Sequence, residues 1–213
     1  MNHPDPDLLH PLPAHPRVVN LRPLAGTRKN VTVGHFAYYD DPEHAAEFFT
    51  RNVLHHHDFM GDHLTIGPFC AFATGAMIIM NGAAHAMDGF TTFPFDIFGG
   101  AWGGAVDLDR YVSASRGDTV IGADVWVGTE AMIMPGLTIG PGAIIAARSV
   151  VTHNVPPFAV VAGNTARTVR QRFDPETTER LLALAWWDWP LDKITQHLAA
   201  IRSRDLAALE AAA

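Results

Sequence analysis

A histidine that follows a run of small residues is the side chain of this sequence best suited to proton transfer. His85 lies in the segment Met80-Asn81-Gly82-Ala83-Ala84-His85-Ala86-Met87-Asp88-Gly89. A histidine has an ordinary pKa of about 6.5, so its neutral ring can act as a general base at neutral pH. A lone histidine is also compatible with a purely structural role, and the elements around it must decide between the two.

Two other groups of side chains could bind a ligand. The run His55-His56-His57-Asp58 would place two histidines on one side of a strand, which is compatible with a metal site. Three arginines, Arg167, Arg170 and Arg172, lie close together and could bind phosphate groups. The alternative for each arginine is a solvated surface charge.

The elements that position these side chains are encoded in a six-residue repeat. An aliphatic residue recurs at every sixth position from Ile121 onward, at Ile121, Val127, Ile133, Ile139, Ile145 and Val151. Small or modest side chains follow four positions later, at Val125, Ala131, Leu137, Ala143, Ser149 and Val155. The same phase occurs around Ile66 and Val33. A helix needs apolar spacing of about 3.6 and a half-buried strand alternates with a period of about 2, so neither explains the repeat.

Each hexapeptide gives a short strand and a turn, and three of them form one triangular coil of about 18 residues. The aliphatic residue fills the interior of the coil. The small residue lies near a corner, where a larger side chain would clash with the next coil. The predicted fold class is therefore all-β, a parallel β-helix with an excursion loop and C-terminal α-helices. A chance repeat within a β-sandwich is the alternative.

The repeat divides the chain into three predicted parts. These are an N-terminal arm over residues 1–30, the β-helix over 31–162 and a C-terminal helical segment over 163–213. Excursions are expected at about 38–60, with a short helix near Pro42, and at 86–118. Ile66 and Ile121 are 55 residues apart, which is not a multiple of six, so a loop must leave the coil between them. Long loops inside compact domains are usually functional.

The C-terminal part has the signals of helices. Asp174 offers an N-cap, followed by Pro175 at the first helical position and an acidic first turn. Pro190 should end this helix, and a second helix is expected over 191–210. The tryptophans Trp186, Trp187 and Trp189 are expected to pack these helices against the coil.

Composition limits the possible partners and location. The chain has 213 residues, 48% of them apolar and 17% charged, with a formal net charge of −7. Such an acidic chain is not expected to bind nucleic acid, which requires a basic face. No apolar run is long enough for a membrane span, and the single cysteine, Cys70, fits a reducing compartment. A cytoplasmic protein without membrane or nucleic-acid partners is predicted.

Several motifs together resemble the xenobiotic acetyltransferase family of hexapeptide-repeat proteins. The segment around His85, with Thr92-Phe93-Pro94-Phe95 after it, is similar to the active-site signature of that family. Its Met-Asn-Gly-Ala-x-His-x-Met-Asp-Gly form is most similar to the streptogramin A (virginiamycin) acetyltransferase branch. The resemblance extends to Gly117-Asp118-Thr119 and to the run Trp186-Trp187-Asp188-Trp189-Pro190. It covers almost the whole chain.

The resemblance implies a left-handed parallel β-helix, a homotrimer and transfer of an acetyl group from acetyl-CoA to a hydroxyl of an antibiotic-like acceptor. His85 would be the general base at the junction of two subunits, with no metal required. The residues implied to bind the cofactor are Trp126, Gly128, Ala146, Gly163, Asn164, Thr165 and Arg170. Those implied to line the acceptor pocket are Tyr38, His55, Met87, Asp88, Phe93 and Ser113. Cys70 would not form an acyl-enzyme, because it occupies a small inward position.

The sequence departs from the family pattern at four places, which leaves the acceptor open. Ala84, Thr165 and His55 stand where the family often has a polar residue, a proline and an aromatic residue, and Ser113-Ala114 replaces Leu-Pro. Streptogramin A is the expected acceptor and chloramphenicol or another xenobiotic alcohol the alternative. Two hypotheses of other classes are a zinc enzyme like the carbonic anhydrases of this fold and a catalytically silent scaffold.

Overall fold

Three sheets form the body of the protein in the computed structural model, and successive strands visit them in fixed rotation. The structure describes residues 3–103, 106 and 108–213; residues 1–2 of the predicted arm and 104–105 and 107 of the second excursion lie outside the described residues. The first sheet contains β2 (Val31–Val33), β5 (Leu64–Ile66), β8 (Thr119–Ile121) and β11 (Thr138–Ile139). The second sheet contains β1 (Val18–Asn20), β3 (Tyr38–Asp40), β6 (Ala71–Phe72), β9 (Trp126–Val127), β12 (Ile144–Ile145), β14 (Ala159–Ala162) and β15 (Arg167–Gln171). The third sheet contains β4 (Val53–Leu54), β7 (Met77–Ile79), β10 (Met132–Ile133) and β13 (Val150–Val151).

This rotation is the arrangement that the hexapeptide repeat predicts. Within each sheet, strands of successive coils are parallel, as in the pairing of Ile66 with Ile121 across the long excursion. The aliphatic residues of the repeat point inward, and all six from Ile121 to Val151 are at most 1% exposed. Removing a buried isoleucine side chain typically costs about 2–5 kcal/mol, so these inward side chains from all three sheets stabilise the coils strongly.

Short helices cover the ends and the excursions. Near the N-terminus are α1 (Leu21–Ala25), η1 (Ala45–Glu47), α2 (Phe48–Arg51) and η2 (Asp58–Met60). The second excursion contains η3 (Asn81–Ala83), η4 (Phe95–Phe98), η5 (Gly100–Trp102) and α3 (Leu108–Val112). The C-terminal part contains α4 (Pro175–Leu184), η6 (Trp186–Asp188), α5 (Leu191–Gln196), α6 (Leu198–Ile201) and α7 (Leu206–Glu210). In the described part of the chain, no helix is long and apolar enough to cross a membrane.

The boundaries of the coil differ from those predicted. β1 pairs antiparallel with β3, and Leu21 of α1 is fully buried, so part of the predicted arm belongs to the core. β3 and β4 belong to the coil, although both fall in the first excursion predicted at 38–60. Each of them pairs in parallel with a strand of the next coil. β15 forms an antiparallel hairpin with β14, so the helical part starts at Pro175 and not at residue 163.

The C-terminal helices are shorter than predicted. α4 ends before Ala185, which adopts a left-handed conformation, and Pro190 follows only after η6. The expected second helix is divided into α5, α6 and α7. Trp186 and Trp187 pack against Phe69 and Phe158 of the coil, as expected. Trp189 does not, because its indole N–H donates to the Leu184 carbonyl within the helical part.

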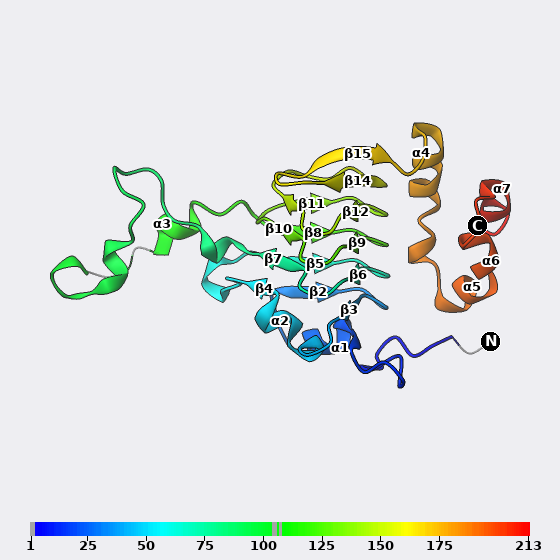
Figure 1. Ribbon diagram of the computed structural model, residues 1–213, viewed down its shortest axis with the longest axis horizontal. Helices are drawn as coiled ribbons and strands as arrows, with labels where there is room; N and C mark the ends of the chain where they lie inside the picture. Colours follow the sequence, from blue (N-terminus) through cyan, green and yellow to red (C-terminus); the bar gives the residue numbers. More distant parts are fainter. Residues whose placement is uncertain (1–2, 104–105, 107) are drawn as a thin grey trace.

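The second excursion and the C-terminal helices lie on opposite sides of the coil (Figure 1). The loop that carries α3 projects from the coil between β7 and β8, whereas α4 to α7 stand beside the other side. These two appendages therefore contact different surfaces.

Candidate functional site

His85 lies where the coil ends and the second excursion begins. The chain leaves β7, passes through η3 and reaches the exposed imidazole of His85. The His85 Nδ1 atom is 2.8 Å from the carbonyl oxygen of Thr92. A carbonyl only accepts hydrogen bonds, so Nδ1 carries the proton and Nε2 of the neutral ring keeps its lone pair. The ring is thus oriented as a base whose free nitrogen is Nε2.

Most of the predicted acceptor residues belong to the same excursion. Met87 is 80% exposed, and the Asp88 carboxylate forms an ion pair with Arg110 at 2.7 Å. This guanidinium lowers the pKa of Asp88. The Ser113 hydroxyl donates to the Arg110 carbonyl at 2.9 Å. The ion pair between Asp88 and Arg110 therefore joins the two arms of the excursion, while the Met87 side chain is exposed.

Aromatic side chains give the excursion an apolar surface. The ring of Phe93 stacks on Phe98 with centroids 5.0 Å apart, and Phe95 makes an edge contact at 4.7 Å. Phe98 and Trp102 are more than half exposed, and Phe90 is fully exposed. An exposed apolar patch of this kind marks a surface that binds a ligand or another chain.

His55 approaches the start of the excursion through its backbone. The His55 carbonyl accepts from the N–H of Gly82 at 3.0 Å. His57 stacks on Phe59, 5.4 Å away, and lies 6.4 Å from His55 between ring centroids. In the described residues no three His, Cys, Asp or Glu side chains form a group that could hold a metal ion. The histidine run therefore gives no support to the zinc hypothesis.

Tyr38 lies on a different surface from His85. Strand register puts six residues in one row across the second sheet: Tyr38, Ala71, Trp126, Ile144, Val160 and Arg170. Tyr38 and Trp126 are partly exposed, at 37% and 54%. Strands are about 4.8 Å apart, so Tyr38 lies about 10 Å from Trp126 along this row. The expectation that Tyr38 and His85 line one cleft is not met within a single chain.

The other predicted cofactor residues lie in the turns that follow strands of the second sheet. Gly128 follows β9, and a Cβ there would come within 2.7 Å of the Ala147 backbone nitrogen. Ala146 follows β12, and its N–H donates to the Val161 carbonyl at 2.9 Å. Gly163 follows β14 with a φ of 101°, and Asn164 and Thr165 continue the turn. Small side chains thus line one edge of the second sheet.

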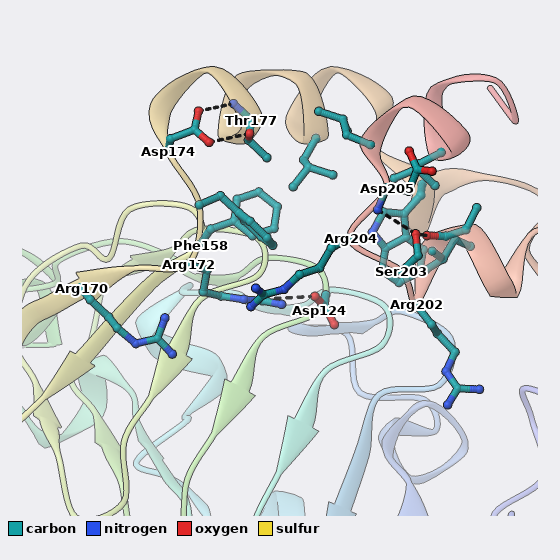
Figure 2. A pocket seen from close by; sticks show the side chains of 17 residues that line it. Asp124, Phe158, Arg170, Arg172, Asp174, Thr177, Arg202, Ser203, Arg204 and Asp205 are labelled. Atoms are coloured by element: carbon teal, nitrogen blue, oxygen red, sulfur yellow. Dashed lines mark hydrogen bonds and ion pairs between the residues drawn. The ribbon is translucent and has the colours of Figure 1, made fainter.

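The arginine cluster differs from the predicted one (Figure 2). Arg170 and Arg172 line a cavity of about 870 Å³ between the coil and the C-terminal helices, and Arg202 and Arg204 line it from the other side. Arg167 lies elsewhere, beside a smaller cavity near His153. Arg202 and Arg204 were not expected in this cluster, because they lie 30 or more residues further along the chain than Arg172.

Arg172 is engaged in structural contacts, which separates it from Arg170. Its guanidinium is 3.5 Å from the Asp124 carboxylate and donates to the Gly142 carbonyl at 2.6 Å. The ring centroids of Phe158 and Phe173 lie 5.6 Å and 5.4 Å from it. Burial raises the pKa of Asp124, and the charge of Arg172 opposes this shift. Arg172 therefore fastens the C-terminal part to the coil.

In one chain His85, the predicted proton-transfer residue, and the row of residues on the second sheet lie on opposite sides of the coil. His85 emerges between the third and the first sheets, and in a three-sided coil this edge is opposite the second sheet. A site that uses both surfaces requires two copies of the chain.

Comparison with known proteins places these features in a family. A family model described as bacterial transferase hexapeptide (six repeats) matches residues 118–153. A probable macrolide acetyltransferase of Lysinibacillus sphaericus is 47% identical over 76% of this chain and 90% of its own length. A chloramphenicol acetyltransferase of Escherichia coli is 42% identical over 84% of this chain and 86% of its own. A virginiamycin A acetyltransferase of Staphylococcus aureus is 39% identical, with 97% and 92% covered.

Proposed function

The chain belongs to the xenobiotic acetyltransferases, within the hexapeptide-repeat transferases, and we propose that its acceptor is a hydroxyl of a streptogramin A-type antibiotic. It is an acetyltransferase that uses acetyl-CoA. The observation that carries the proposed chemistry is the contact of His85 Nδ1 with the Thr92 carbonyl, because it leaves Nε2 as a base. The relative that aligns with 97% of this chain is a virginiamycin A acetyltransferase, which supports this acceptor class.

In the proposed reaction, His85 Nε2 takes the proton of the acceptor hydroxyl while its oxygen attacks the thioester carbonyl of acetyl-CoA. The new C–O bond gives a tetrahedral oxyanion, and cleavage of the C–S bond releases the thiolate of CoA. That thiolate receives the proton from His85, so the enzyme returns to its starting state. General-base catalysis of this kind contributes about 10²- to 10⁴-fold.

We further propose that the active site is formed between neighbouring copies in a homotrimer of left-handed coils. His85, Met87, Asp88, Phe93 and Ser113 would come from one copy. Acetyl-CoA would lie along the second sheet of the other, beside Trp126 and the turns at Gly128, Ala146, Gly163, Asn164 and Thr165, with Arg170 near a phosphate. The opposite placement of these two surfaces in one chain supports this arrangement. The proposed compartment is the cytoplasm.

Thiol release from acetyl-CoA tests the acceptor assignment directly. Purified protein is assayed with streptogramin A, chloramphenicol, a macrolide and water, and kcat/KM should be at least tenfold higher for streptogramin A than for the others. His85→Ala, assayed in parallel, controls for contaminating activity. The relatives from Escherichia coli and Lysinibacillus sphaericus make chloramphenicol and a macrolide the alternative acceptors. A preference for either of them would overturn the proposed acceptor but not the proposed reaction.

A pair of variants tests whether Tyr38 contacts the acceptor and Trp126 contacts acetyl-CoA on the second sheet. Tyr38→Ala should raise KM for the acceptor severalfold and leave KM for acetyl-CoA nearly unchanged, because it removes a ring and a hydroxyl that orient the acceptor. Trp126→Ala is the matched control, since it removes an exposed aromatic ring two strands away and should raise KM for acetyl-CoA instead. Equal rises in both constants for Tyr38→Ala would assign it a structural role.

A further inference from the structure

The excursion that carries His85 leaves the coil and returns to it at one buried asparagine. Asn81 is 1% exposed and opens η3 after β7. Its Nδ2 donates to the Gly117 carbonyl at 2.8 Å, and its Oδ1 accepts from the backbone N–H of Arg116 at 2.8 Å. A single amide side chain therefore joins the outgoing and returning ends of the excursion.

A buried carboxylate on the preceding coil holds this asparagine. Asp62 Oδ2 accepts from the Asn81 backbone N–H at 3.0 Å and from its Nδ2 at 2.7 Å. The Asp62 side chain is fully buried, and its Oδ1 has no hydrogen-bond partner within the described part of the chain. His56 Nε2 lies 3.9 Å from that oxygen. A buried carboxylate with an unsatisfied oxygen costs free energy, which favours a role in geometry over one in stability.

The path from this asparagine to His85 has little freedom. Gly82 donates its N–H to the His55 carbonyl at 3.0 Å. A Cβ at Gly82 would lie 2.4 Å from that oxygen and 2.4 Å from the His57 ring. The backbone is thus confined against the corner of the preceding coil, three residues before His85.

We propose that Asp62 and Asn81 are positioning residues for His85. They fix the root of the excursion, and both the His85 ring and the Thr92 carbonyl that sets its tautomer lie within that excursion. Neither residue touches the acceptor or acetyl-CoA; each acts through the backbone that carries His85. This inference rests on the proposed function, in which His85 Nε2 is the base.

Asn52 provides a matched control for the loss of a buried amide. It is 6% exposed, and its Nδ2 donates to the Tyr39 hydroxyl at 3.0 Å and to the Ala76 carbonyl at 2.9 Å. Like Asn81, it bridges two coils, but it holds no part of the second excursion. Asn52→Ala should therefore lower the melting temperature without displacing His85.

The test compares kcat, KM and thermal stability of Asn81→Ala and Asn52→Ala, assayed well below both melting temperatures. Asn81→Ala should lower kcat at least tenfold with KM for acetyl-CoA within twofold of the wild type, whereas Asn52→Ala should keep kcat within twofold. Asp62→Asn, which preserves volume and one acceptor oxygen, should give an intermediate loss. Asp62→Asn also provides the test of the proposal if Asn81→Ala does not fold. Equal losses of kcat in Asn81→Ala and Asn52→Ala, or an unchanged kcat in both excursion variants, would overturn the proposal.

A second measurement does not depend on catalysis. In protein labelled with ¹⁵N-histidine, the resonances of His85, identified by their loss in His85→Ala, should report the Nδ1–H tautomer in the wild type. Asn81→Ala should shift them toward a mixture of tautomers, and Asn52→Ala should not. Unchanged His85 resonances in Asn81→Ala would sink the positioning role, whatever acceptor the enzyme uses. Failure of the acetyl-transfer assay alone would refute the proposed function and leave this result standing.

Discussion

A neutral histidine acts as a base only through the ring nitrogen that carries no proton, and in this chain one contact decides which nitrogen that is. The Thr92 carbonyl accepts from His85 Nδ1, so the lone pair is on Nε2. The sequence analysis includes Thr92 and Asn81 in the same motif as His85, but their contacts could not be predicted. A backbone acceptor seven residues from His85 depends on the path of an irregular loop. The contacts of Asn81 with Asp62 and Gly117 cross from one coil to another.

His85→Ala should lower kcat at least about a hundredfold and leave KM for acetyl-CoA close to the wild-type value, as expected for loss of a general base. Steady-state kinetics with the preferred acceptor measures this, and circular dichroism checks the fold. His153→Ala is the control, since it removes an exposed imidazole from the segment after β13 and should keep most of the activity. A His85→Ala enzyme with more than about a third of wild-type turnover would contradict the assignment.

Cys70 has the wrong environment for a nucleophile. It is fully buried, and burial raises the pKa of its thiol to about 12, so almost no thiolate exists at neutral pH. Cys70→Ala should therefore keep kcat within about twofold, and thiol reagents should not inactivate the native enzyme. Loss of turnover in a variant that still folds, or detection of an acetylated Cys70 by mass spectrometry, would indicate an acyl-enzyme instead of direct transfer.

At the scale of elements, the coil was predictable because one physical requirement repeats. Each inward position needs a buried apolar side chain, and the regular spacing from Ile121 to Val151 reveals this requirement. The first coils were harder to delimit, since β3 and β4 flank an excursion that interrupts the repeat. The positions of the corners were also hard to predict from the sequence. Phe36, Phe69 and Asp124 adopt positive φ angles of 54–61° at turns where glycine would be expected.

The first C-terminal helix illustrates a local signal that the structure confirms. Asp174 Oδ1 accepts from the Thr177 N–H at 2.9 Å, and this bond lowers the pKa of Asp174. A carboxyl group with a lowered folded-state pKa stabilises the fold above its ordinary pKa, and this contribution is lost as pH falls through the lowered value.

Asp174→Asn keeps an N-cap acceptor but cannot ionise, so at neutral pH it should melt slightly below the wild type. Asp174→Ala should melt several degrees lower, because the cap is lost. The wild-type advantage over Asp174→Asn should shrink as pH falls below about 4, which melting curves from pH 7 to 3 would measure. A difference independent of pH would mean that the carboxylate charge contributes nothing to the cap.

At the scale of the whole molecule, the two surfaces proposed to meet in the reaction point away from each other. The excursion with His85 projects from one edge of the coil and exposes Phe90, Phe98 and Trp102. The row from Tyr38 to Arg170 lies on the sheet opposite that edge. An isolated chain would leave both surfaces in water, whereas a closed ring of copies lets each excursion cover its neighbour's second sheet.

The solution mass should therefore be about 69 kDa, three times the 23.1 kDa of one chain, in light scattering at the concentrations used for assays. A stronger test mixes two impaired chains, because a composite site can be rebuilt from them. His85→Ala keeps an intact second sheet, and Trp126→Ala keeps an intact His85. When the two are unfolded together and refolded, roughly a quarter of the sites in randomly mixed trimers combine an intact surface from each chain. Activity at subsaturating acetyl-CoA should therefore reach at least about a quarter of the wild-type value and exceed the average of the two variants refolded separately. Activity no greater than the average of the two separate preparations, or a fully active monomer, would place the whole reaction within one chain.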